Sequence, residues 1–153
     1  MQYGIFLPNT TERVVFFLFH QTITSAKVKR MLALVVAQHG PVRDGLVSLL
    51  EASPHINKIV QVKEIGAAWD LVQAISPDIT LIYVISLTQE LSTFITNLNG
   101  VCSFPILAIV GSEDDRRMAL VAGADVAFLE GVPSSKLANQ IEQSIQRYLL
   151  AKQ

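Results

Sequence analysis

The stretch from Asp78 to Ile85 (DITLIYVI) constrains the fold more than any other part of the chain. Every residue after Asp78 is β-branched, large and apolar, or aromatic, and Pro77 and Ser86 flank the run. A run without polar alternation predicts a strand that is buried on both faces, as in the centre of a parallel sheet. Ligands of such sheets bind beyond the carboxyl ends of the strands. The residues from Tyr83 to Ile85 should therefore decide the chemistry, and none of them is a carboxylate nucleophile or a ligand for a hard metal ion.

Length and composition predict one globular domain. The 153 residues, 50% of them hydrophobic and 16% charged, are enough for one buried core and few for two domains. The longest apolar runs, Val14 to Phe19 and Met31 to Ala37, are much shorter than the roughly 20 residues of a membrane-spanning helix. We therefore expect no membrane span. A lone cysteine, Cys102, allows no disulfide framework, so a cytoplasmic protein is expected.

Charge is distributed unevenly along a chain whose net charge is −1. Residues 1–30 hold four basic residues against one acidic residue, a net charge of +3, so the rest of the chain carries −4. Nucleic-acid phosphates require clustered lysine or arginine, and in the acidic part only Arg116 and Arg117 are adjacent. Direct nucleic-acid binding is therefore not expected.

Residues 1–30 differ in pattern from the rest and are predicted to be an N-terminal extension. Val14 to Phe19 favours a strand, whereas Thr22 to Arg30 is typical of a polar or basic connector. Three interpretations stay open. The segment packs on the domain as an added strand or helix, binds a partner as an arm, or lies upstream of a functional start at Met31.

From Met31 onward, predicted strands and helices alternate over short connections. Five strands and five helices in this order predict a doubly wound α/β domain with a five-stranded parallel sheet over residues 31–150. The expected strands are Leu32 to Val36, Lys58 to Val62, Asp78 to Ile85, Phe104 to Val110 and Val126 to Leu129. The expected helices are Pro41 to Ala52, Gly66 to Ile75, Gln89 to Leu98, Glu113 to Ala122 and Ser134 to about Leu150.

Local signals refine several of these helices. Val42, Leu46, Leu49 and Leu50 have the spacing of one apolar face, which predicts the buried side of the first helix. Asn99 followed by Gly100 predicts the end of the third helix.

The start of the fourth helix carries a hydroxyl followed by three acidic residues. We interpret Ser112 as its N-cap and Glu113, Asp114 and Asp115 as acidic residues that favour the positive end of the helix dipole, rather than as a metal site.

Five segments of the predicted domain align, in order and without gaps, with one known family. They are Leu34 to Leu46 (LVVAQHGPVRDGL), Leu50 to Ala52, Pro77 to Ile82, Phe104 to Leu107 and Ala122 to Asp125 (AGAD). The ordered set resembles the receiver domains of bacterial two-component response regulators, particularly those that precede a helix-turn-helix module. The resemblance covers about residues 31–150 and implies a flavodoxin-like (βα)5 fold.

The resemblance also shows a loss of the family's phosphorylation chemistry. That chemistry needs an acidic pair that holds magnesium, an acceptor aspartate, a hydroxyl residue, a lysine and an aromatic switch residue. The corresponding positions are Ala37 and Gln38 for the acidic pair, Tyr83 for the acceptor, Val110 for the hydroxyl, Glu130 for the lysine and Ala127 for the aromatic residue.

Physical chemistry agrees with that loss. Magnesium requires anionic oxygen ligands in near-octahedral geometry, which an alanine and a neutral amide do not supply. A phenol cannot form an acyl phosphate, and Glu130 would repel a phosphoryl group instead of offsetting its charge. We therefore expect no bound magnesium, no cofactor and no enzymatic activity.

The sequence thus predicts a pseudo-receiver, a phosphorylation-independent protein-interaction domain in bacterial signal transduction. The expected partner is another protein or a second copy, bound through the fourth and fifth predicted helices. The expected contact residues are Arg116, Arg117, Val121, Gln140, Ile141 and Ser144. The alternative is a flavodoxin-like protein that binds a small molecule or cofactor in an apolar pocket near Val110, Val84 and Ile85.

A few other side chains have simpler interpretations. We expect Tyr83 to form a structural hydrogen bond with Glu130, His39 to be an ordinary loop residue and Cys102 not to be a nucleophile. Trp69, Met118, Leu120 and Val121 are interpreted as core or interface residues.

Overall fold

The computed structural model describes residues 30–101 and 104–151. The predicted extension therefore lies outside the described residues except for Arg30, and so does Cys102. Within the described part, strands and helices alternate along the chain. They are β1 (Met31–Val36), α2 (Pro41–Glu51), β2 (Ile56–Val62), α3 (Ile65–Ile75), β3 (Ile79–Tyr83), α4 (Gln89–Val101), β4 (Ile106–Val110), α5 (Glu113–Ala122), β5 (Val126–Leu129) and α6 (Ser134–Ala151).

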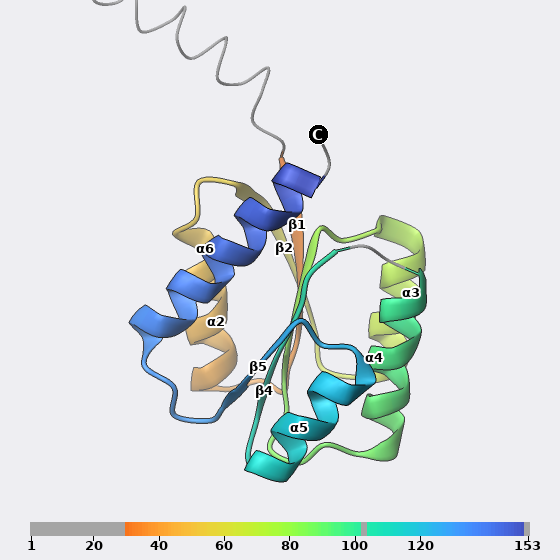
Figure 1. Cartoon of the computed structure of the whole chain (residues 1–153). Coiled ribbons are helices and arrows are strands. Elements are labelled where there is room, and N and C mark those ends of the chain that lie inside the picture. The colour runs from red at the N-terminus through yellow and green to blue at the C-terminus, as the bar shows by residue number, and fades with distance from the viewer. Residues whose placement is uncertain (1–29, 102–103, 152–153) are drawn as a thin grey trace, which may run out of the picture. The chain divides into compact units, whose positions relative to one another are not determined.

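The five strands form one parallel sheet in the order β2-β1-β3-β4-β5. Helices α2 and α6 cover one face, and α3, α4 and α5 cover the other (Figure 1). This order is that of flavodoxin-like doubly wound folds. The predicted fold class is therefore confirmed. No helix in the described residues is long and apolar enough to cross a membrane.

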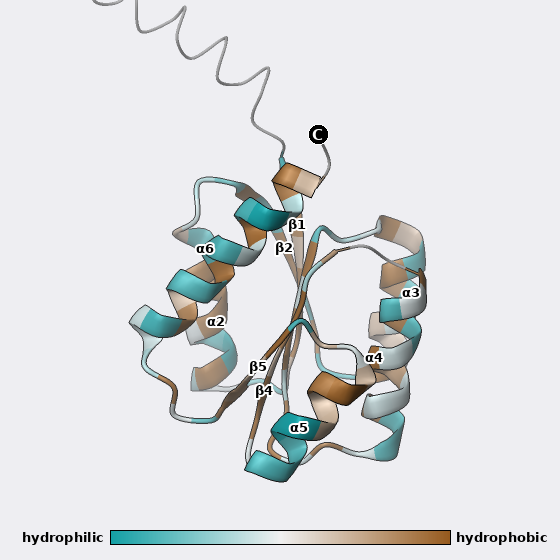
Figure 2. Ribbon diagram, in the orientation of Figure 1, coloured by the Kyte–Doolittle hydropathy of each residue, from teal (hydrophilic) through white to brown (hydrophobic). Residues whose placement is uncertain are grey.

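Strand β3, which lies within the apolar run from Asp78 to Ile85, is at the centre of the sheet between β1 and β4, as predicted. Its residues Ile79 to Ile82 are buried, and the strands are brown in Figure 2 while much of the outer helix surface is teal. The strand is shorter than predicted because it ends at Tyr83, and the side chain of Ile85 is 68% exposed. Apolar residues beyond Tyr83 thus belong to a loop, although the N–H of Val84 still donates to the carbonyl of Ile109 at 3.0 Å.

The predicted end of the third helix is wrong. Helix α4 continues through Asn99 and Gly100 to Val101, and Gly100 does not adopt a positive φ. The left-handed glycine lies instead at Gly123 (φ 124°), directly after α5. A Cβ atom on Gly123 would lie 2.8 Å from the side chain of Asn99, so the end of α5 packs closely against the last turns of α4.

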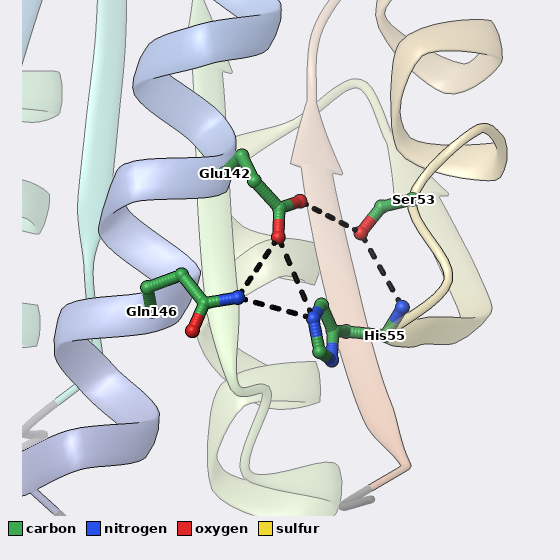
Figure 3. A network of polar contacts seen from close by, with 4 residues as sticks. All are labelled: Ser53, His55, Glu142 and Gln146. Carbon is green, nitrogen blue, oxygen red and sulfur yellow. Dashed lines mark hydrogen bonds and ion pairs between the residues drawn. The ribbon is translucent and has the colours of Figure 1, made fainter.

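At the amino edge of the sheet, polar contacts join α6 to the turn between α2 and β2 (Figure 3). Ser53 Oγ donates to Glu142 Oε1 at 3.3 Å, and the second oxygen of that carboxylate lies 3.4 Å from His55 Nε2. Gln146 Nε2 donates to the same oxygen at 3.2 Å. These contacts hold α6 against the turn between α2 and β2.

Candidate functional site at the carboxyl edge of the sheet

The parallel register carries the ends of all five strands to one edge. The N–H of Ala37 donates to the carbonyl of Val62 at 2.9 Å, and that of Glu130 donates to the carbonyl of Val110 at 2.7 Å. Tyr83 lies opposite Ile109 in the pairing of β3 with β4. The positions named by the family resemblance therefore lie along this edge, although their side chains do not all meet.

Tyr83 and Glu130 are brought into contact. The Tyr83 hydroxyl donates a short hydrogen bond to Glu130 Oε2, as the sequence predicted. Tyr83 is half-buried and Glu130 exposed, so the pair lies at the rim of the sheet edge and not in the core. By the resemblance, Tyr83 takes the position of the phosphoryl acceptor and Glu130 that of the lysine. In this chain the phenol instead donates a hydrogen bond to the carboxylate.

The other positions that the resemblance named divide into two groups. Ala37 and Gln38 line the same cavity as Tyr83, and Gln38 is exposed. Val110 and Ala127 are buried, with exposed fractions of 0% and 7%. Neither can reach a ligand at this cavity.

The hydrogen bond to Glu130 raises the pKa of the Tyr83 phenol above its usual value, assisted by partial burial and by the negative charge of the carboxylate. A raised phenol pKa means that this contact stabilises the fold below about pH 10, and that the contribution is lost as pH rises through the Tyr83 pKa.

We expect E130Q to lower the Tyr83 pKa. Phenolate absorbance measured during an alkaline titration, with Y83F subtracted to remove Tyr3 and Tyr148, would show it. An identical titration in E130Q and wild type would contradict this.

The cavity at this edge has a volume of about 450 Å³. It differs from the apolar pocket proposed as the alternative, because Val110 is fully buried, Ile85 is mostly exposed and only Val84 of those three lines it. Its walls mix apolar residues with polar and charged ones, so only part of the expected apolar lining is present and the small-molecule alternative stays a prediction. The walls comprise Val36, Ala37, Gln38, Lys63, Glu64, Ile65, Gly66, Tyr83, Val84, Ser86, Thr88, Glu90 and Leu91.

The charged residues of this wall were missed from the sequence. Glu64 precedes α3 and Glu90 lies in the first turn of α4, so each reads locally as a helix-start residue. Among the described residues, no group of three or more histidine, cysteine or acidic side chains has the arrangement of a metal site.

Arg43 is a second residue that sequence reasoning missed. Its side chain is buried and donates from Nη1 to the carbonyl of Ala37 at 3.0 Å and from Nε to Gln61 Oε1 at 2.8 Å. The buried stripe of α2 is Arg43, Leu46 and Leu50. Val42, predicted to be buried, is 42% exposed. The buried guanidinium binds the loop after β1 and so takes a place where an apolar residue was expected.

The loop after β4 is held against the loop after β3. The N–H of Gly111 donates to the carbonyl of Ile85 at 3.1 Å, and that of Leu87 donates to Asp115 Oδ2 at 3.2 Å. A Cβ atom on Gly111 would lie 2.3 Å from that same Ile85 oxygen. The two loops that border the site are therefore packed with no room for a side chain at this glycine.

The acidic start of α5 behaves as predicted for a cap. Ser112 Oγ accepts from the N–H of Asp115 at 3.1 Å. Glu113 pairs with Arg116 at 2.7 Å, and Asp114 forms a short contact with Arg117. The pairing with Arg116 lowers the pKa of Glu113. These carboxylates are engaged locally, which supports the capping interpretation over a metal site.

Four exposed apolar residues lie on α5 and at the end of β5. They are Met118, Leu120, Val121 and Leu129, and Val121 is 89% exposed (Figure 2 shows the brown C-terminal half of α5). Leu129 also lines a groove of about 460 Å³, whose lining includes Arg116, Glu130 and Lys136. We call the four apolar residues the α5–β5 surface.

The predicted interaction residues are placed only in part at the surface. Arg117 and Val121 are exposed, and Arg116 and Gln140 are partly exposed. The prediction was wrong for Ile141 and Ser144, whose exposed fractions are 2% and 3%. They belong to the buried stripe of α6, which also contains Leu137, Ile145 and Tyr148.

Two other interpretations are also tested by the structure. Trp69 is partly buried and packs edge-on against Phe94, with ring centroids 6.2 Å apart, so it belongs to the core. Met118, Leu120 and Val121 are exposed, which leaves the interface interpretation for them. His39 is exposed in the loop after β1.

No family model matches the sequence, and no curated protein matches it. Solved structures do match, and those most similar to this chain include response-regulator receiver domains. The signal receiver domain of the response regulator NarL from Mycobacterium tuberculosis has a TM-score of 0.66 and 18% identity, over 77% of this chain and 98% of its own. A LuxR-family DNA-binding response regulator from Silicibacter pomeroyi has a TM-score of 0.64 and 22% identity, over 76% and 92%.

An orphan response regulator of H. pylori has a TM-score of 0.64 and 13% identity, over 75% of this chain and 96% of its own. Identities this low establish a shared fold. The residues of the site must carry the functional argument.

Proposed function

We propose that this chain is a pseudo-receiver, a cytoplasmic signalling domain that binds a protein partner without being phosphorylated. The observation that carries the proposal is the hydrogen bond between Tyr83 and Glu130, at the positions where the resemblance expects an acceptor carboxylate and a lysine. A phenol already bonded to a carboxylate is neither a phosphoryl acceptor nor a cation that offsets phosphoryl charge.

The neighbouring positions support the same proposal. Ala37 has no oxygen in its side chain, and Gln38 offers a neutral amide, which is a weak ligand for magnesium. Val110 and Ala127 are buried and lack the hydroxyl and the ring through which receivers of the resembling family change state. A ligand that contacts two arrangements equally cannot shift the population between them, so the domain is expected to stay in one arrangement.

The α5–β5 surface supports the protein-binding part of the proposal. Apolar residues that gather on one face of a monomer mark an interaction site more often than scattered ones do. The groove lined by Leu129 also contains Arg116 and Lys136, which could form the polar rim of an interface around the apolar residues. A second copy of this chain is the simplest partner, and a specific dimer would bury about 800 Å² on each copy.

The first prediction from this proposal concerns phosphorylation. Incubation with acetyl phosphate and magnesium should add no stable phosphoryl group, because no carboxylate stands at Ala37, Gln38 or Tyr83. Intact-mass spectrometry is the measurement, with an active receiver domain treated in parallel as the control. A magnesium titration followed by Trp69 fluorescence should show no saturable change. A stable mass increase of one phosphoryl group on this chain would refute the proposal.

The second prediction concerns assembly. Sedimentation at several concentrations should show a dimer whose stability is unchanged by beryllofluoride, since the domain has no site for a phosphoryl mimic. V121K should weaken the dimer at least tenfold, because it places a charge at the most exposed apolar residue of the α5–β5 surface. V42K is the matched control, since Val42 is an exposed valine on α2 at the other face of the sheet.

Two results would count against the assembly prediction. Equal weakening by V121K and V42K would remove the α5–β5 surface as the interface. A shift in assembly caused by beryllofluoride would show that a phosphoryl-sensitive switch survives, which contradicts the pseudo-receiver proposal.

A further inference from the structure

A second cavity lies at the amino edge of the sheet, opposite the degenerate phosphorylation site. Its volume is about 340 Å³. One wall is the C-terminal half of α6, and the other is formed by the segments that enter β4 and β5. The lining residues are Phe104, Pro105, Asp125, Ser144, Arg147, Tyr148 and Ala151.

The α6 wall presents a hydroxyl and a cation on one stripe. Ser144, Arg147 and Tyr148 have the i, i+3, i+4 spacing that places side chains on the same side of a helix. Ser144 is 3% exposed, and its Oγ has no hydrogen-bond partner within the described residues. A buried hydroxyl without a partner costs about 1–3 kcal/mol, and native structures contain few of them. The unused hydrogen-bonding capacity of Ser144 beside this cavity therefore points to a ligand with a polar group.

Opposite charges line the same cavity without neutralising each other. Arg147 forms no ion pair within the part of the chain that the structure describes, and its side chain is exposed. Asp125 is anchored by one oxygen, Oδ2, which accepts from the N–H of Ile106 at 2.7 Å. Its Oδ1 makes no hydrogen bond within those described residues. The lining thus offers one cation and one carboxylate oxygen.

The rest of the lining is apolar. Phe104 and Pro105 are buried residues that lead into β4. The hydroxyl of Tyr148 is engaged with Asp78 Oδ1 at 3.0 Å, so the ring is held in place. Small-ligand sites combine such apolar walls with a few polar groups, in cavities of about 300–1,000 Å³. A volume of about 340 Å³ lies at the small end of that range.

We propose that this cavity binds a small zwitterion, a free α-amino acid with an apolar side chain. The guanidinium of Arg147 pairs with the carboxylate, for which its planar fork is suited. Asp125 accepts from the ammonium group, and the apolar side chain packs on Phe104 and Pro105. Rotation of Ser144 about χ1 to another staggered position lets its hydroxyl donate to the ligand carboxylate. A dianion such as phosphate is a poorer ligand because Asp125 repels it.

Three matched probes test this assignment on the full chain. L-Phenylalanine carries both charges, 3-phenylpropionate lacks the ammonium group and phenethylamine lacks the carboxylate. Backbone amide shifts, followed by NMR during titration, should saturate with L-phenylalanine at millimolar concentration. The affected amides should cluster at Phe104, Ile106 and residues 124–126 and 144–151. Each of the other two probes should bind at least tenfold more weakly, because each leaves one charged group of the cavity unpaired.

Variants locate the site within the cavity. R147Q should weaken L-phenylalanine at least tenfold, and S144A should weaken it by a smaller factor of about three. K58Q is the control, because it removes a positive charge from an exposed residue of β2, at the opposite side of the sheet from β4 and β5, and should leave binding unchanged. Thermal melts without ligand show whether a variant is folded, and D125N tests the ammonium contact separately.

Two outcomes would overturn the proposal. Equal affinity of the three probes would show that the cavity binds the phenyl group without recognising either charge. No saturable shift at these amides up to about 20 mM would show that the cavity binds no amino acid of this class, since that limit corresponds to only a few kcal/mol of affinity.

Discussion

G111A should destabilise the domain by about 3 kcal/mol, the upper end of the usual cost of overpacking. The new Cβ would lie 2.3 Å from the carbonyl oxygen of Ile85, and this oxygen is held by a hydrogen bond from the N–H of Gly111 itself. Neither group is a flexible side chain that can turn away, so the two loops must separate. Urea unfolding followed by circular dichroism would measure the loss of stability.

The matched control for this prediction is G45A. Gly45 lies on the exposed side of α2, and a Cβ atom there meets nothing within 4 Å. Alanine should therefore stabilise α2 by about 0.5–1 kcal/mol through its higher helix propensity. Opposite signs for the two variants would show that the contact at Gly111 matters and not the methyl group as such. A G111A protein as stable as wild type would show that the two loops are not held together as described.

D78A should also cost about 3 kcal/mol, because it removes the acceptor of two buried or partly buried donors. Asp78 Oδ2 accepts from the N–H of Leu32 at 2.9 Å, and Oδ1 accepts from the hydroxyl of Tyr148 at 3.0 Å. The carboxylate thereby joins the beginning of β3 to β1 and to α6. Urea unfolding again gives the free energy of unfolding.

Two variants control the Asp78 prediction. D78N keeps one acceptor oxygen of similar position and should fall between D78A and wild type. D70A removes an exposed carboxylate from α3 and should change stability by less than about 0.5 kcal/mol, as surface substitutions usually do. If D78A and D70A had equal effects, the link between β3, β1 and α6 would contribute nothing measurable.

The Gly111 contact bears on the proposed function as well as on stability. The loop after β4 and the loop after β3 lie at the carboxyl edge that holds the candidate site, and they are hydrogen-bonded to each other. Under the proposed function, this packing agrees with a domain that stays in one arrangement and binds its partner constitutively. A variant such as G111A therefore also tests whether the α5–β5 surface depends on that loop packing, through its effect on sedimentation.

Much of the fold was predictable because its signals are local. The apolar runs in β1 and β3 exceed what an exposed strand can carry, so they had to be central strands of a parallel sheet. The start of α5 followed from a hydroxyl cap at Ser112, which acts within one helical turn. The contact between Tyr83 and Glu130 was also predictable, since parallel strands end at one edge.

The burial of individual helix residues was decided by the tertiary structure. Periodicity shows that α6 has a buried stripe, but the width and direction of that stripe depend on how α6 lies on the sheet and on α2. Ile141 and Ser144 therefore looked like surface residues and proved to be buried. For the same reason Arg43 replaced Val42 at the buried side of α2, because a long side chain can reach the carbonyl of Ala37 and Gln61 only once β1 and β2 stand beside the helix.

By itself, the sequence determined the order of strands and helices and the parallel sheet, because each depends on residue types at short spacing. Only the tertiary structure decided which side chains share a cavity. One cavity at the amino edge is lined by residues that are far apart in the chain, including Phe104, Asp125 and Arg147. They come together because β4, β5 and α6 pack against one another there. Local sequence patterns cannot predict this cavity, because the contacts that form it join segments that are distant in the sequence.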